Sequence, residues 1–156
     1  MRHFFLHLPM PLPAALLCLV VAISDGDTLT ARCGAPGAYE RIKVRVAAID
    51  APERRQAFGQ KSRQNLAQMC FKRQAALQPI EEDSYGRTVA NVRCNGADVA
   101  TAQVAAGLAW VYAPYAEHHP HLAPLQRRAR AGGEGLWAQK RPLAPWDYRH
   151  RHQKPY

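Results

Sequence analysis

Hydrophobic and polar residues alternate along several short stretches of this chain, which is the pattern of β-strands with one buried face. The alternation is clearest over residues 41–49, where basic side chains at positions 41, 43 and 45 alternate with apolar ones. This predicted strand ends before Pro52, because proline has no N–H for a sheet and restricts the residue that precedes it. Four other stretches are predicted to be strands, over residues 20–24, 28–33, 74–80 and 88–94.

Three further stretches indicate helices. Residues 58–71 carry their larger apolar side chains at helical spacing. Residues 98–106 follow with Asp98 as the N-cap and Gly107 as the residue that ends the helix. Residues 122–131 predict a third helix with a basic face.

The order strands, helix, strands, helix, helix lacks the βαβ alternation of a parallel sheet. It predicts an α+β fold in which helices pack against a small closed β-barrel. A length of 156 residues with 47% hydrophobic residues suits a single domain with one core, which we place at residues 20–140. Residues 141–156 are rich in Pro, Arg and His and are expected to form an irregular tail.

Residues 1–19 are expected to be a signal peptide or an N-terminal membrane anchor. Arg2 precedes an apolar stretch over residues 8–23, as in a secretory signal. No A-x-A cleavage site is visible, and the stretch is interrupted by prolines and is short for a spanning helix. We therefore expect an exported protein, periplasmic or secreted, with an uncleaved anchor as the alternative.

The chain is strongly basic, with a formal net charge of +9. Such a field favours polyanionic partners, and these include nucleic acid, an anionic membrane and an acidic polymer. Charge alone is also compatible with simple solubility. It does not distinguish between these partners, so the candidate chemistry has to come from individual residues.

Two aspartates are candidate ligands for a cation. Asp27 and Asp50 each lie at a turn beside an apolar strand, which exposes a carboxylate on a rigid backbone. Hard divalent cations prefer oxygen ligands of this kind. Taken singly, either aspartate is better explained as a turn-capping residue.

Three more residues suit phosphate chemistry. Arg45 lies on the polar face of its strand and Arg87 follows a tight turn, and guanidinium groups bind phosphate oxygens through two hydrogen bonds. Glu53 directly follows Pro52, and an ionised carboxylate there can act as a general base. Each of them alone is also a common kind of surface residue.

The combination of these residues resembles the staphylococcal nuclease family. The motifs are DGDT at residues 25–28, VRVAAIDAPE at 44–53 and DSYGR at 83–87. Weaker similarities lie at residues 58–60, 107–112 and 135–137, so that the resemblance covers about residues 20–140. Three separated motifs in the same order are specific, whereas DGDT alone is a weak signal.

The resemblance implies a five-stranded OB-fold barrel with three packed α-helices. It also implies a Ca²⁺ ion held by the carboxylates of Asp27 and Asp50 and by the backbone carbonyl of Ala51. The family's type sequence has threonine at the position of Ala51, but only the backbone is expected to act there.

The same resemblance implies roles in catalysis. Glu53 would activate or orient the attacking water, and Arg45 and Arg87 would stabilise the pentacoordinate phosphate, with Arg87 also assisting the leaving oxygen. The products would carry 3′-phosphate ends. Tyr85 matches a position that contacts nucleotide phosphate, although Ser84 replaces a lysine that precedes it in the family pattern.

The chain has four cysteines and no CxxC or Cys/His spacing typical of zinc sites. In an OB-type barrel the end of the first helix and the end of the 88–94 strand are expected to approach, which predicts a Cys70–Cys94 disulfide. Cys33 is then left as a free thiol, and Cys18 belongs to the N-terminal apolar stretch. The alternative is that Cys33, Cys70 and Cys94 are all reduced.

The leading hypothesis is therefore an exported, monomeric endonuclease that uses Ca²⁺ to cut DNA and RNA and needs no obligate protein partner. One alternative is a nuclease-like barrel that binds nucleic acid without cutting it. Another is a cationic envelope protein with a structural role. All five candidate side chains are present, which favours the enzyme.

Overall fold

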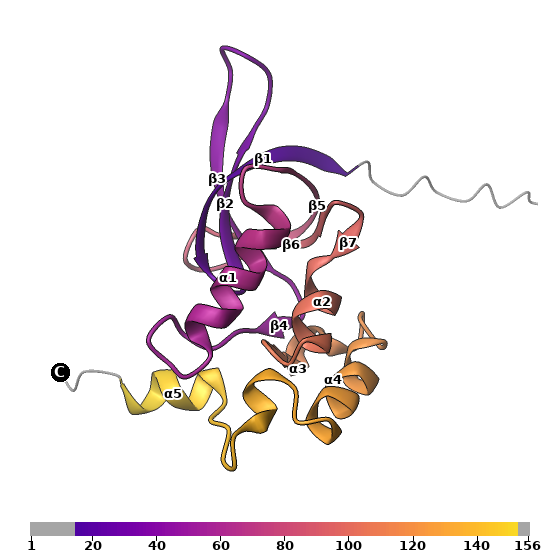
Figure 1. Ribbon diagram of the computed structural model, residues 1–156. Helices are drawn as coiled ribbons and strands as arrows, with labels where there is room; N and C mark the ends of the chain where they lie inside the picture. Colours follow the sequence, from indigo (N-terminus) through magenta and orange to yellow (C-terminus); the bar gives the residue numbers. More distant parts are fainter. Residues whose placement is uncertain (1–14, 153–156) are drawn as a thin grey trace, which may run out of the picture.

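The structure is a computed structural model that describes residues 15–152, and its centre is a closed β-barrel (Figure 1). Each strand of the barrel pairs with the next in the order β3-β2-β1-β5-β6, and a parallel pairing of β3 with β6 closes the ring. These strands are β1 (Leu16–Asp25), β2 (Thr28–Cys33), β3 (Glu40–Val46), β5 (Gln74–Glu82) and β6 (Thr88–Cys94). The expectation of a five-stranded OB-type barrel with packed helices is confirmed.

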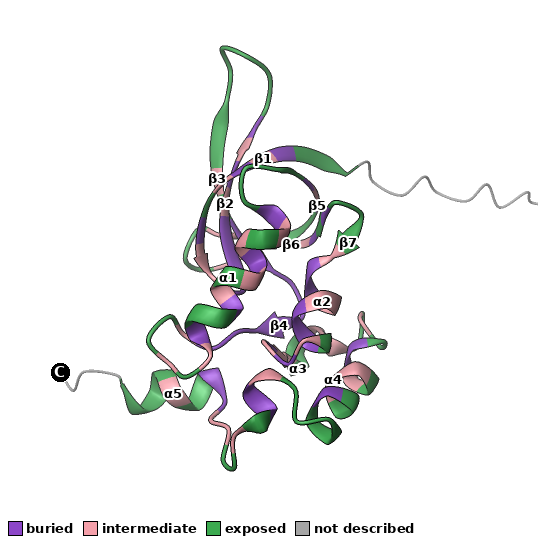
Figure 2. Ribbon diagram, viewed as in Figure 1, coloured by how far each residue is buried: buried purple, intermediate pink, exposed green. Residues whose placement is uncertain are grey.

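The alternation seen in the sequence fills the barrel. Val20, Leu29, Val44, Leu77 and Val92 come from the five different strands and are all fully buried. Burying side chains of this size stabilises a fold by about 1.5–3 kcal/mol each. Figure 2 shows the contrast between this interior and the exposed tip of the β2–β3 hairpin, which projects beyond the barrel.

The three helices that the sequence predicts are present: α1 (Gly59–Cys70) and α2 (Val99–Ala105) pack against the barrel, and α4 (Leu122–Ala131) packs against α2. Asp98 caps α2, since its carboxylate accepts a hydrogen bond from the N–H of Thr101. Shorter elements complete the fold: β7 (Ala97–Asp98), β8 (Trp110–Val111), α3 (Ala113–Ala116) and a 3-10 helix, η1 (Gly135–Ala138).

The predicted strand over residues 41–49 is wrong at its end. Strand β3 stops at Val46, and Ala48 has a positive φ of 72°, so that residues 47 and 48 form a turn. The guanidinium of Arg45 stabilises this turn by donating to the carbonyls of Val46 and Ile49. Beyond the turn, β4 (Ile49–Asp50) leaves the barrel and pairs with β8.

The expectation of an irregular tail after residue 140 is also wrong for part of that segment. Helix α5 (Pro145–Arg151) occupies it. Pro145 lies in its first turn with Asp147, and Arg149, His150 and Arg151 lie in its last turn. An acidic residue near the start of a helix and basic residues near its end interact favourably with the helix dipole, and proline is common in a first turn. The helix could have been predicted from this pattern.

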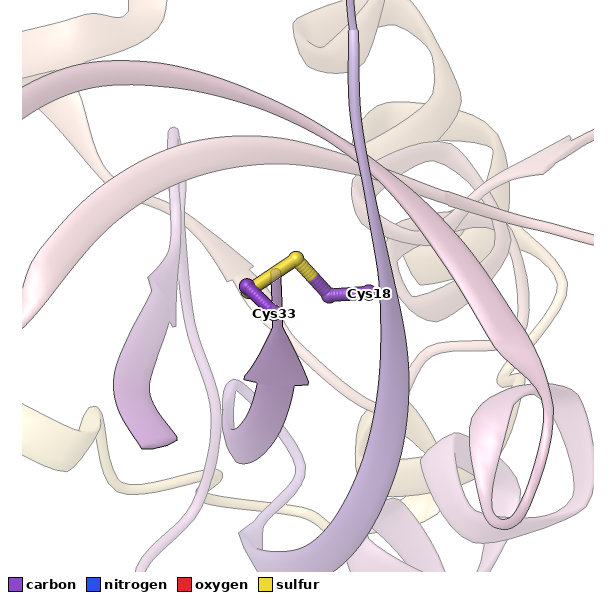
Figure 3. The surroundings of a disulfide bond; sticks show 2 residues. All are labelled: Cys18 and Cys33. Atoms are coloured by element: carbon purple, nitrogen blue, oxygen red, sulfur yellow. A yellow bond between two sulfur atoms is a disulfide. The ribbon is translucent and has the colours of Figure 1, made fainter. Parts of the chain in front are cut away.

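The cysteines form two disulfides. The structure contains the expected Cys70–Cys94 pair, but the expectation that Cys33 is free is wrong, because Cys33 pairs with Cys18 (Figure 3). The pairing follows from the barrel: β1 extends back to Leu16, which places Cys18 opposite Cys33 on the neighbouring strand β2. An even number of cysteines was the available signal for this second pair.

The expected N-terminal segment falls mainly on residues 1–14, which lie outside the described residues. Residues 16–19, which were assigned to that segment, belong to β1. Within residues 15–152, no helix has both the length and the apolar character needed to cross a membrane.

Candidate active site

One pocket gathers the predicted chemical side chains at the edge of the barrel. Its volume is about 670 Å³, and it is bounded by the β1–β2 turn, β3, β4 and the β5–β6 turn. The predicted residues that line it are Asp27, Arg45, Asp50, Glu53, Tyr85 and Arg87. Side chains that are up to 60 positions apart in sequence thus face the same space.

Asp27 is held by hydrogen bonds on both carboxylate oxygens. The hydroxyl of Thr28 donates to Oδ1 over 2.8 Å, and the N–H of Ala51 donates to Oδ2 over 2.7 Å. The side chain is almost fully buried, with 6% of the residue exposed. Ala51 does not itself line the pocket, and its backbone N–H contacts the site through Asp27.

The turn that carries Asp27 rests on helix α1. A Cβ atom on Gly26 would lie 1.8 Å from Oγ and 2.7 Å from Cβ of Ser62, so only glycine allows this approach. The buried amide of Gln103 fixes both partners, since its Nε2 donates to the carbonyl of Gly26 over 2.7 Å and to that of Ser62 over 3.0 Å. The glycine of the DGDT motif is thus required by packing.

Asp50 and Arg45 form the centre of the site with Asp27. Asp50 is 1% exposed, and Arg45 lies 3.6 Å from a carboxylate oxygen of each aspartate. Burial raises the pKa of Asp50 above its ordinary value, hydrogen bonds from Arg149 offset part of this rise, and the charge of Asp27 adds to it.

A third aspartate adds negative charge nearby. Asp25 lines the same pocket, and burial raises the pKa of its carboxyl, with further contributions from the charges of Asp27 and Glu53. The side chain of Arg54 acts in the opposite direction. Carboxylates crowded in this way favour the binding of a cation, because a positive charge relieves their mutual repulsion.

Arg87 and Tyr85 lie on a different side of the pocket from the paired aspartates and come from the β5–β6 turn. Nε of Arg87 donates to Asp83 over 2.7 Å, which fixes the guanidinium at its base. The guanidinium carbon lies 5.4 Å from the ring centroid of Tyr85, and Tyr85 is 83% exposed. This pair is therefore accessible to a ligand that enters the pocket.

Glu53 has a partner that the sequence analysis missed. Its carboxylate accepts a hydrogen bond of 2.9 Å from Nη1 of Arg149 in helix α5. The same guanidinium binds Asp50 through two hydrogen bonds, of 3.1 Å to Oδ1 and 2.7 Å to Oδ2. The guanidinium in contact with Glu53 is thus that of Arg149.

The donor chemistry of the pocket suits a hard divalent cation. Two buried carboxylates, Asp27 and Asp50, face each other across Arg45, and oxygen atoms are the ligands that calcium prefers. Among residues 15–152 no three His, Cys, Asp or Glu side chains form a metal-binding group. A cation there would therefore need backbone carbonyls or water in addition to the two aspartates.

Comparisons with known proteins agree with this geometry. The family described as "Staphylococcal nuclease homologue" matches residues 43–139. An uncharacterised endonuclease of Haemophilus influenzae is 43% identical over 132 residues, which cover 85% of this chain and 72% of that protein. Protein ParB of Escherichia coli is 36% identical over 140 residues, which cover 83% of this chain and 77% of that protein. An uncharacterised endonuclease of Escherichia coli O157:H7 is 34% identical over 133 residues, which cover 85% of this chain and 84% of that protein.

Proposed function

Because this chain belongs to the staphylococcal nuclease family and is a hydrolase of phosphodiester bonds, we propose that it is a Ca²⁺-dependent endonuclease that cuts both DNA and RNA. The observation that carries this proposal is the convergence of two buried aspartates, two arginines and a glutamate on one pocket. Its volume of about 670 Å³ is within the usual range for a site that holds a small ligand or a nucleotide.

Asp27 and Asp50 are the proposed carboxylate ligands of calcium, with the backbone carbonyl of Ala51 as a third oxygen. When bound, the ion supplies positive charge to the scissile phosphate. The hydrogen bonds from Thr28 and Ala51 hold the Asp27 carboxylate in place before any ligand arrives. Preorganisation of this kind lowers the cost of binding.

The two arginines are proposed to stabilise the charge that develops on the phosphate. Arg45 is anchored by the carbonyls of Val46 and Ile49, and Arg87 is anchored by Asp83, so neither needs to reorganise during the reaction. Arg87 would also assist the leaving 5′ oxygen, which leaves 3′-phosphate ends. Tyr85 is proposed to contact a nucleotide phosphate from the exposed side of the pocket.

Glu53 is proposed to accept a proton from the attacking water or to orient it. The residue lies at the pocket wall, and its position is fixed by a hydrogen bond from its own backbone N–H to the side chain of Gln56. General base catalysis contributes about 10²–10⁴-fold to a rate. Replacing Glu53 by Gln should therefore lower the rate by a factor in this range while nucleic acid still binds.

The test is cleavage of supercoiled plasmid and of a labelled RNA by the purified protein, with CaCl₂ and then with a chelator. We expect nicking and linearisation of the plasmid and cutting of the RNA only with Ca²⁺. The DNA products should be extended by a DNA polymerase only after a phosphatase has removed their 3′-phosphate. Glu53→Gln should be strongly impaired, whereas Glu40→Gln, an exposed residue at the start of β3, should be unaffected.

Each other result has a defined meaning. Cutting that survives chelation rejects the calcium mechanism. Binding of DNA without any cutting would support the alternative of a nuclease-like module that only binds nucleic acid. A normal rate for Glu53→Gln would show that catalysis does not need Glu53, and it would not contradict the proposed calcium site.

The protein is further proposed to be exported and to act as a monomer without an obligate protein partner. All four cysteines are paired in disulfides, and such bonds persist in oxidising compartments. An exported protein should appear in the periplasm or medium with a shortened N-terminus. Recovery in the membrane fraction with an intact N-terminus would support the uncleaved anchor, and recovery in the cytoplasm would reject export.

A further inference from the structure

Arg149 makes the densest set of charged contacts in the pocket. Its two terminal nitrogens bind both oxygens of Asp50, and one of them also binds Glu53, at distances of 2.7–3.1 Å. Charge-assisted pairs with this two-bond geometry are among the strongest hydrogen bonds in proteins. The guanidinium therefore neutralises the same two carboxylates on which the proposed function depends.

Arg149 comes from the C-terminal part of the chain, beyond the residues that the family description matches. The family match ends at residue 139, whereas Arg149 lies in α5, which spans Pro145–Arg151. Figure 1 shows α5 lying beside the loop that leads from β4 into α1, and Glu53 belongs to that loop. Helix α5 thus brings Arg149 to the wall of the pocket.

Helix α5 is held mainly by contacts near its first turn and by Arg149. Nε2 of Gln56 donates to the carbonyl of Leu143 over 2.6 Å, and the ring of Trp146 lies 5.5 Å from that of Trp110. Pro145 is the one residue of the helix that is buried, and the side chain of Arg149 is 44% exposed. Water can therefore reach the guanidinium and replace its hydrogen bonds when it leaves.

A calcium ion and the guanidinium of Arg149 would compete for the carboxylate oxygens of Asp50. Both oxygens of Asp50 already accept hydrogen bonds from Arg149, and a metal ligand must direct at least one oxygen to the ion. The two positive charges would also repel each other at such short range. Binding of the ion therefore competes with the Arg149 contact, because the two positive groups repel each other and share the same carboxylate oxygens.

We propose that α5 is an autoinhibitory latch in which Arg149 occupies Asp50 and Glu53 until calcium displaces it. This inference rests on the proposed role of Asp50 as a calcium ligand. The latched form then lowers the apparent affinity for calcium in proportion to its population. Removing the guanidinium should restore the intrinsic affinity.

The experiment measures calcium binding to the full chain, stripped of metal, by isothermal titration calorimetry with CaCl₂. Arg149→Gln removes the charge and keeps a polar side chain, and we expect it to bind calcium on the order of tenfold more tightly than the unmodified protein. Arg151→Gln is the matched control, because Arg151 is exposed in the same helix and has no carboxylate partner among the described residues.

Fluorescence gives a second measurement that does not depend on the affinity of the variant. Calcium should change the tryptophan emission of the unmodified protein as Trp146 leaves Trp110, and the change should be lost in Trp146→Phe. Arg149→Gln should already show part of the shifted emission without calcium, while Arg151→Gln should behave as the unmodified protein.

The outcomes separate the two proposals. If the unmodified protein binds calcium and Arg149→Gln binds it no more tightly, the latch is rejected and the calcium site stands. If Arg149→Gln binds calcium normally but binds DNA more weakly, Arg149 is a phosphate contact and the latch is again rejected. If neither form binds calcium, the calcium-dependent function fails and the latch fails with it.

Discussion

The carboxylate of Asp27 accepts a hydrogen bond of 2.7 Å from the backbone N–H of Ala51, 24 residues further along the chain. This bond joins the β1–β2 turn to the residue that follows β4. It holds Asp27 and Asp50 on one side of the pocket, so the proposed cation ligands are positioned by the backbone before any ion is bound.

Asp27→Asn should abolish measurable calcium binding, because an amide oxygen lacks the charge that attracts the ion. The asparagine can keep a single hydrogen bond to Ala51 or Thr28, so we expect a loss of about 1–2 kcal/mol in the free energy of unfolding. Calorimetry with CaCl₂ and chemical denaturation measure the two effects. Glu40→Gln, an exposed residue at the start of β3, is the control and should alter neither. Normal calcium affinity in Asp27→Asn would remove Asp27 from the proposed ligand set.

Gly26→Ala should destabilise the protein although the change adds only a methyl group. The new Cβ would lie 2.7 Å from Cβ of Ser62, so helix α1 and the turn must move apart. We expect a cost of about 1–3 kcal/mol in the free energy of unfolding. Gly132→Ala is the matched control, since its Cβ would meet its nearest neighbours at 3.5 Å and its φ of −84° suits alanine. Equal unfolding midpoints for the two variants would contradict the packing argument.

Loss of the Cys18–Cys33 disulfide should lower the stability of the barrel. The bond closes a separation of 15 residues, for which the chain-entropy estimate is about 3 kcal/mol. Replacing both cysteines by serine should therefore lower the unfolding midpoint, while the Cys70–Cys94 pair remains oxidised. Thermal unfolding with intact-mass analysis checks this. An unchanged midpoint would show that the β1–β2 pairing does not need the bond.

The Cys18–Cys33 disulfide limits where the N-terminal segment can be cleaved. If the N-terminal segment is removed, the cut should lie before Cys18, because a cut after it would leave Cys33 without a partner. The mature protein should then contain no reactive thiol. N-terminal sequencing and a thiol assay on the unfolded, unreduced protein test this, and one thiol per chain would contradict it.

The Asp83–Arg87 contact should contribute to stability at neutral pH and not in acid. Partial burial raises the pKa of Asp83, but hydrogen bonds from the backbone N–H groups of Arg87 and Tyr85 and from the Arg87 guanidinium lower it by more. A carboxyl whose pKa is lowered by folding stabilises the fold above its ordinary pKa, near 4. That contribution disappears as the pH falls through the lowered value in the folded state.

Asp83→Asn should accordingly be less stable than the unmodified protein at pH 7, and the difference should disappear as the pH falls through the lowered pKa of Asp83 in the folded state. The comparison needs denaturant unfolding at several pH values. Cleavage at neutral pH should also slow, because Arg87 loses the carboxylate that fixes its guanidinium. A stability difference that persists unchanged in acid would show that the ionised form of Asp83 is not what matters.

Much of the barrel and of the pocket was determined by the local sequence. Alternation of apolar and polar residues reports which face of a strand is buried, and this property depends on neighbours two positions away. Strand β6 was predicted with its observed ends, and the motifs around Asp27 and Arg87 placed these residues at or directly after turns that line the pocket. The prediction for the aspartates was wrong in two respects: Asp50 lies in strand β4, and both carboxylates are buried. Closure of the barrel then brings these separate segments together around one pocket.

Other features were decided only by the tertiary structure, because they join segments whose sequences carry no sign of each other. Arg149 and Asp50 are 99 residues apart, and a lone arginine in a basic tail looks like any solvated charge until α5 is seen to pack beside the pocket. The partner of Cys33 depended on β1 beginning at Leu16, which sets the register of the β1–β2 pair. Local periodicity fixes which face of each element is buried, whereas packing alone selects the distant groups that meet there.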